Sequence, residues 1–132
     1  MTRCVRLWTG EDQNSYFEEG TLHFTLGGRS GSASGELATT TLSFQETVAG
    51  GAFTWHTAPV RQLVITLCGT LDFETRRGQH FIIRPGDILF AEDTVGSGHR
   101  WRLTDSEPWR RAYAVLQPGV TVPFLSTKRA NE

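Results

Sequence analysis

Hydrophobic and polar residues alternate along most of this chain with a period of two, which places successive side chains on opposite faces of a β-strand. The alternation is clear in the segments 21–26 (TLHFTL) and 37–48 (LATTTLSFQETV), and the second of these is also rich in β-branched residues. Similar segments predict further strands over 53–56, 61–68, 71–75, 79–83, 88–91, 99–103, 109–117 and 120–124. No segment has the pattern of an amphipathic helix of ordinary length, so the chain is predicted to be all-β.

Glycine, proline and short polar residues separate these segments and predict the turns between them. Pro-Gly-Asp at 85–87 predicts a tight turn with a positive φ at its glycine. The segment 27–36 (GGRSGSASGE) is a Gly/Ser-rich loop that fits either a hairpin connection or a lid. Residues 1–20 predict an edge strand or arm followed by a polar turn.

The length of 132 residues fits one domain, residues 1–132, with a core over about 37–118 and an N-terminal strand or arm over 1–26. A content of 38% hydrophobic and 20% charged residues is typical of a folded chain. The net charge of −1 gives no electrostatic signature of a nucleic acid or an anionic membrane as a partner. No apolar run approaches the length of a membrane span and the N-terminus lacks a signal-peptide pattern, so a cytoplasmic protein is expected.

Two histidines, His56 and His99, are distant from each other in the sequence, and each follows glycines that predict turns. Gly50 lies six positions before His56, Gly69 closes the following strand, and Gly78 and the Pro-Gly-Asp turn precede His99. This spacing resembles the cupin superfamily, whose two motifs run G-x5-H-x-H-x3,4-E-x6-G and G-x5-P-x-G-x2-H. The resemblance covers about residues 37–118. It implies a single-domain double-stranded β-helix, the jelly-roll barrel, and a homodimer formed through edge strands, where an unpaired N-terminal arm would otherwise be exposed.

The chain departs from the cupin pattern at two of its metal-binding positions. Metal-dependent cupins usually present three histidines and one glutamate. Here His56 and His99 remain, Ala58 stands at the position of another histidine, and Gln62 replaces the glutamate. Since an amide oxygen is a weak ligand compared with a carboxylate, the expectation is that no metal cofactor is used. A divalent metal held by His56 and His99, with Gln62 or a nearby carboxylate, is the alternative.

Strand alternation predicts which side chains share the interior with these two histidines. The candidate catalytic residues are His56, His99, Gln62 and Glu46, and the candidate substrate contacts are Phe44, Thr66, Asp93, Trp101 and Tyr113. Such a set combines apolar walls with a few polar groups, which is typical of small-molecule pockets. Asp93 also fits two other roles, a cap of the 92–98 corner or a carboxylate that orients His99. The arginines at 100, 102, 110 and 111 are interpreted as solvated strand faces, with binding of a carboxylate or phosphate as the alternative.

Three functions remain open on this reasoning. The first is an enzyme that binds a small organic molecule inside the barrel and moves protons with imidazole and carboxylate groups, without a metal. Cyclisation, condensation, isomerisation or dehydration in specialised metabolism would suit such a site. The second is a metal-dependent cupin dioxygenase or isomerase. The third is a non-catalytic module that binds a small ligand.

Overall fold

The chain folds into β-strands joined by turns. The computed structural model describes residues 1–26 and 31–127, which contain thirteen strands and no helix. The all-β prediction is therefore confirmed for this part of the chain. The strands are β1 (Arg3–Thr9), β2 (Ser15–Leu22), β3 (Thr25–Leu26), β4 (Ser32–Ala33), β5 (Thr39–Thr47), β6 (Ala52–His56), β7 (Gln62–Cys68), β8 (Leu71–Thr75), β9 (His80–Ile83), β10 (Ile88–Ala91), β11 (His99–Leu103), β12 (Trp109–Leu116) and β13 (Phe124–Ser126).

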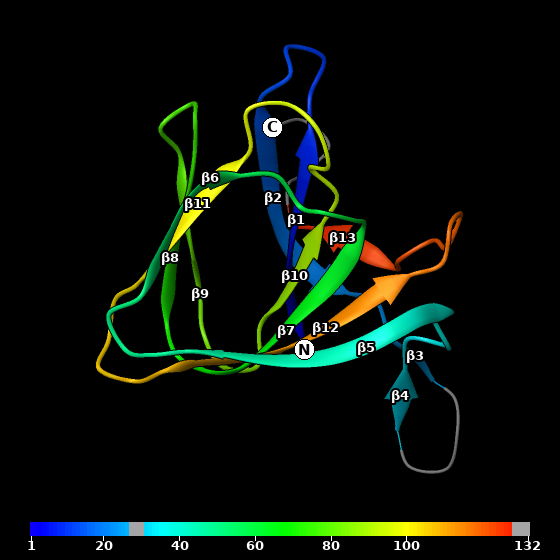
Figure 1. The fold of residues 1–132 in the computed structure, drawn as a ribbon. Helices are drawn as coiled ribbons and strands as arrows, with labels where there is room; N and C mark the ends of the chain where they lie inside the picture. Colours follow the sequence, from blue (N-terminus) through cyan, green and yellow to red (C-terminus); the bar gives the residue numbers. More distant parts are fainter. Residues whose placement is uncertain (27–30, 128–132) are drawn as a thin grey trace.

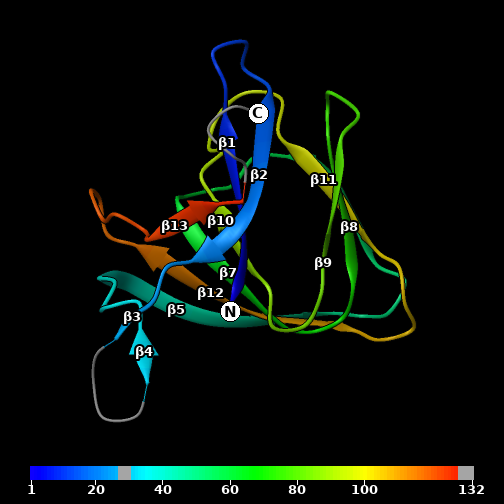
Figure 2. The ribbon, with the colours of Figure 1, turned by 180° about the vertical axis from the view of Figure 1, so that it is seen from behind.

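Two sheets carry the fold. The larger sheet has seven strands in the order β13-β2-β1-β10-β7-β12-β5, and the smaller has four in the order β6-β11-β8-β9 (Figure 1). From β5 to β12 the chain passes back and forth between them, with β5, β7, β10 and β12 in the larger sheet and β6, β8, β9 and β11 in the smaller. Figure 2 shows the same arrangement from behind, with β8, β9 and β11 apart from the larger sheet. Residues close in sequence therefore reach both walls of the interior.

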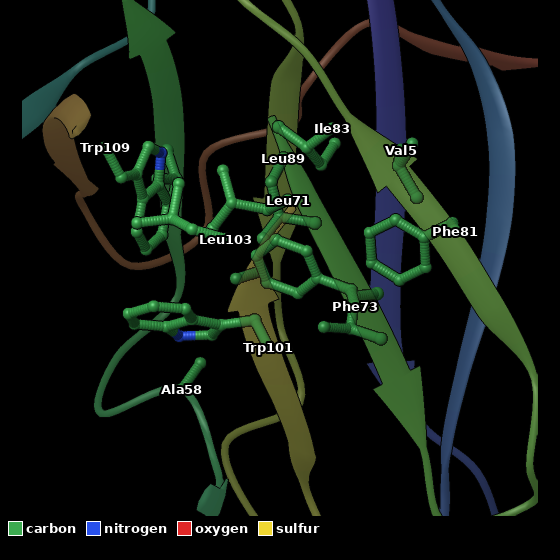
Figure 3. Close-up of a cluster of buried hydrophobic side chains, with 13 residues drawn as sticks. Val5, Ala58, Leu71, Phe73, Phe81, Ile83, Leu89, Trp101, Leu103 and Trp109 are labelled. Carbon is green, nitrogen blue, oxygen red and sulfur yellow. The ribbon is translucent and has the colours of Figure 1, made fainter. Parts of the chain in front are cut away.

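The main hydrophobic core lies between these two sheets. Its members come from strands of both: β1, β7, β10 and β12 on one side and β8, β9 and β11 on the other (Figure 3). Phe73 is at its centre, with its ring stacked 5.0 Å from that of Phe81 and in edge contact with Trp109 at 6.2 Å. On β8, strand alternation buries Leu71, Phe73 and Thr75 and leaves the residues between them partly exposed.

The N-terminal segment corrects one prediction. β1 is a central strand and not an edge strand, because it pairs antiparallel with β2 and parallel with β10. The edges of the larger sheet are β13 and β5 instead. The homodimer stays a prediction, but an unpaired N-terminal arm no longer supports it.

The turn at 85–87 and the short β3–β4 hairpin bear on two predictions made from the sequence. The glycine of the predicted 85–87 turn has φ +91°, as expected. β3 and β4 pair antiparallel as a hairpin, and β4 lies inside the predicted 27–36 loop, so the loop was predicted too long. Residues 27–30 of the predicted loop or lid lie outside the described residues. The described part of the chain contains no helix capable of spanning a membrane.

Candidate functional site

A cavity of about 520 Å³ opens between the two sheets next to the core. This volume lies within the range of small-molecule sites, and its walls are mainly apolar and aromatic. The lining residues are Ser43, Gln45, Thr47, Ala52, Phe53, His56, Ala58, Pro59, Gln62, Val64, Phe73, Leu89, Ala91, His99, Trp101, Trp109, Arg111, Tyr113 and Val115.

His56 and His99 meet in this cavity. His56 is the last residue of β6, His99 is the first of β11, and the two are direct partners in the antiparallel pair. Their ring centroids lie 4.5 Å apart, with the ring planes at 61°. Two imidazoles from segments more than forty residues apart therefore share one part of the cavity wall.

A glycine allows this close approach. Gly98, directly before His99, has φ +74°, a conformation that residues with a side chain rarely adopt. A Cβ atom on Gly98 would also lie 2.2 Å from the carbonyl oxygen of His56. The absence of a side chain at this position is what lets β6 pass close enough to place the two rings together.

His99 is held by a carboxylate behind it. Its Nδ1 lies 2.6 Å from Oδ2 of Asp93, and the same oxygen accepts a hydrogen bond of 2.7 Å from the Ser15 hydroxyl. Asp93 is fully buried, and an isolated carboxylate there would be unfavourable without such donors. Because a carboxylate accepts hydrogen bonds, this contact favours the neutral imidazole tautomer that carries its proton on Nδ1 and its lone pair on Nε2. Asp93 thus orients His99 and does not cap the 92–98 corner.

His56 has the same proton arrangement with a different partner. Its Nδ1 lies 2.7 Å from the carbonyl oxygen of Thr54, which can only accept, so Nε2 again carries the lone pair. Burial lowers the pKa of His56 below its ordinary value of 6.5; the hydrogen bond to Thr54 opposes this, and the neighbouring His99 adds to it. At neutral pH His56 is therefore an uncharged base.

Three of the other predicted site residues reach the cavity. Gln62, Trp101 and Tyr113 line it alongside the two histidines. Asp93 does not line it and acts through His99. Thr66 is buried but also lies outside the lining, where its hydroxyl accepts a 3.1 Å hydrogen bond from Nε1 of Trp109.

Phe44 and Glu46 were placed on the wrong face of β5. Phe44 pairs with Ala112 and is 70% exposed, and Glu46 forms a surface ion pair of 2.9 Å with Arg110. The alternate residues of β5, namely Ser43, Gln45 and Thr47, face the cavity instead. Strand parity grouped Phe44 with Glu46 correctly, but it did not say which of the two faces points inward.

Sequence reasoning missed Ser15 and Arg111. Ser15 lies 78 positions from Asp93, and no sequence signal connects the two. Arg111 was interpreted as part of a solvated face, yet it is 3% exposed and lines the cavity. A signal did exist, because Arg111 alternates with Trp109 and Tyr113 on one face of the last long strand.

The residues present do not fit the ligand set of a metal-dependent cupin. Among the described residues, no group of three or more His, Cys, Asp or Glu side chains is arranged to hold a metal ion. Ala58 supplies no ligand, and the nearest carboxylate, Asp93, is hydrogen-bonded to His99 on the side of the ring away from its free nitrogen. Two imidazoles and the amide of Gln62 leave the site without the anionic ligand that such a metal prefers.

No protein-family model matches the chain, and neither does any curated protein.

Proposed function

We propose that this protein is a cupin-type jelly-roll enzyme that binds a small organic substrate in its cavity and transfers protons with His56 and His99, without a metal. The reaction class is one that needs only proton movement, such as isomerisation, cyclisation, condensation or dehydration. The single observation that carries the proposal is the hydrogen bond from Nδ1 of His99 to the buried Asp93, beside a second imidazole in a mostly apolar cavity.

The strand order supports the jelly-roll part of the proposal. In a jelly roll, successive strands fall in alternate sheets that face each other. The alternation of β5 to β12 between the two sheets fits this description. The cupin assignment itself depends on the glycine, proline and histidine spacing described above.

His99 is the base that we expect to act first. Its Nε2 lone pair accepts a proton from a substrate C–H or O–H bond, and the bonding electrons stay on the substrate as an enolate or alkoxide. The resulting imidazolium is stabilised by Asp93, which already accepts its other N–H. The proton then returns from Nε2 to a different substrate atom, so that the enzyme ends in its starting state.

His56 has a complementary part in this cycle. Its ring lies close enough to His99 that a positive charge on one disfavours a positive charge on the other. The pair therefore holds one extra proton and not two. A neutral His56 beside a protonated His99 can take or deliver the proton at a second position of the substrate, which a 1,2- or 1,3-shift requires.

Deuterium exchange tests the proposal without knowledge of the natural substrate. Untagged protein treated with EDTA is incubated in D₂O with phenylacetone and with phenylpyruvate, and deuterium at carbon is measured by NMR. We expect catalysed exchange that falls at least about 10²-fold in His99→Ala, because a positioned base contributes on this scale. His80→Ala is the matched control, since His80 also contacts an aspartate, at 2.9 Å, but lies on the surface.

Two results would favour the other functions. Exchange that disappears on chelation and returns with one transition-metal ion per chain would support the metal-dependent enzyme. Tight binding without exchange, unaffected by loss of either cavity histidine, would support the binding module.

The pH dependence follows from His56. Its lowered pKa means that it stays unprotonated to a lower pH than free histidine does. Since the unprotonated form is the active one, exchange is expected to be present above the His56 pKa and to fall as the pH drops through it. The part of the acid limb that is set by His56 should therefore lie below pH 6.5. NMR titration of the imidazole identifies the group, and a His56 that titrates above 6.5 together with the activity would contradict this prediction.

A further inference from the structure

A buried arginine occupies the cavity wall without a negative partner in the part of the chain that the structure describes. Arg111 on β12 is 3% exposed and lines the cavity. Its Nε donates to the Tyr113 hydroxyl at 3.0 Å, and its Nη1 donates to the Thr47 hydroxyl at 2.8 Å and to the Trp109 carbonyl at 3.2 Å. All three acceptors are uncharged. No hydrogen bond from Nη2 is present among the described residues.

The positive charge of Arg111 is not balanced locally. Six arginines pair with carboxylates, namely Arg3, Arg6, Arg61, Arg100, Arg102 and Arg110, but none of the ion pairs of residues 1–26 and 31–127 includes Arg111. The described residues that line the cavity contain no aspartate, glutamate or lysine. Burying a charge without an ionic partner is unfavourable, and an anion in the cavity would offset the charge of Arg111 further than the surrounding aromatic rings do.

A series of aromatic rings in mutual contact lies between Arg111 and the two histidines. The Phe53 ring lies 4.3 Å from that of His56, Trp101 lies 6.2 Å from Phe53, and Trp109 lies 4.7 Å from Trp101. The Arg111 guanidinium then stacks 3.8 Å above Trp109. These rings are tilted or edge-to-face to one another and give the cavity an aromatic side between the cation and the imidazoles, which suits an aromatic or conjugated ligand.

We infer that Arg111 anchors the carboxylate of a planar aromatic or conjugated substrate whose reacting atoms lie at His56 and His99. The inference deepens the proposed function, on which its assignment of the reacting end depends. A carboxylate is the favoured anion because it carries one charge, which a single guanidinium neutralises, and because its oxygens can accept hydrogen bonds from Nη2, the guanidinium nitrogen that makes none within the described residues. A phosphate dianion would leave excess negative charge in an apolar cavity.

Binding measurements on intact protein test this assignment. The probes are cinnamate, phenylacetate and indole-3-acetate, each compared with its own primary amide by isothermal titration calorimetry. Each amide keeps the planar shape of its acid and removes the charge. At least one carboxylate is expected to bind at least about tenfold more tightly than its amide, which is the scale of a desolvated charge-assisted contact.

Two variants distinguish an effect of Arg111 itself from an effect of removing any positive charge from this strand. Arg111→Met should abolish the preference for the carboxylate. Arg110→Met should keep it, because the neighbouring Arg110 faces outward and pairs with Glu46. If Arg111→Met does not fold, the comparison of acids with amides on the unaltered protein still decides the question.

Three results would overturn the inference: amides that bind as tightly as the acids, no binding by any of the acids, or a folded Arg111→Met that retains the preference. The proposed function fails separately. A carboxylate preference in protein without His99-dependent exchange would reject proton transfer and keep the anchor, whereas His99-dependent exchange with equal binding of acids and amides would reject the anchor alone.

Discussion

Asp93→Asn is expected to slow proton exchange by about 10²- to 10⁴-fold, although Asp93 does not line the cavity. The carboxylate makes its contribution through Nδ1 of His99, at 2.6 Å. An asparagine can turn its NH₂ group toward that nitrogen, and the imidazole then moves its proton to Nε2, where it no longer acts as a base. The amide also removes the negative charge that stabilises the imidazolium.

The measurement separates this role from a structural one. The ¹⁵N chemical shifts of His99 report which ring nitrogen is protonated, and a change of tautomer in Asp93→Asn is expected alongside the slower exchange. The double variant His99→Ala, Asp93→Asn should be about as slow as His99→Ala alone, because the two residues act as one unit. Asp72→Asn is the control, since Asp72 makes the comparable contact with His80 on the surface. An unchanged exchange rate in folded Asp93→Asn would contradict the mechanism.

Gly98→Ala is expected to destabilise the protein by several kcal/mol and to separate the two histidines. The positive φ alone makes a side chain unfavourable by about 1–3 kcal/mol. In addition, the new Cβ would lie 2.2 Å from the His56 carbonyl oxygen, so β6 has to move. The free energy of unfolding from urea titration measures the loss, and the exchange rate should fall with it.

Gly119→Ala provides the matched control for this prediction. Gly119 also has a positive φ, +83°, but a Cβ there would meet nothing within 4 Å. Both variants therefore carry the backbone strain, and only Gly98→Ala carries the contact with His56. Equal losses of stability in the two would show that the close approach of β6 is not important.

The alternation of hydrophobic and polar residues was sufficient to predict much of the fold. The strands around His56 and His99 were predicted close to their observed bounds because period-two alternation and glycine turns are local properties of the chain. The prediction that these two histidines lie in one cavity came from the resemblance of their spacing to the cupin motifs. Local strand and turn patterns alone did not predict it. Their hydrogen-bond partners were less accessible, since Asp93 was also compatible with a corner cap.

The wrong predictions concerned the position of a strand in its sheet and the face of a strand that points inward, which local sequence patterns do not specify. β1 was predicted as an edge strand, but it pairs with β10, more than eighty positions later in the chain. Phe44 was predicted to line the pocket together with Glu46, which shares its face of β5, yet the pairing of Phe44 with Ala112 and its 70% exposure place it on the outer face of the larger sheet. β5 is an edge strand with apolar residues on its outer face. Its own sequence therefore does not indicate which of its two faces points toward the cavity.

The amino-acid pattern was sufficient to predict that this chain forms strands, where most of them begin and end, and which side chains within each strand share a face. These are consequences of backbone geometry and turn chemistry, which act over a few residues. The three-dimensional arrangement was needed to show which faces enclose the cavity and that Ser15 and Asp93 form hydrogen bonds on the far side of His99. It was also needed to show that Arg111 is buried and has no carboxylate partner within residues 1–26 and 31–127. Those outcomes depend on the pairing of distant strands, because burial and electrostatic partnership are properties of the assembled sheets and not of any one segment.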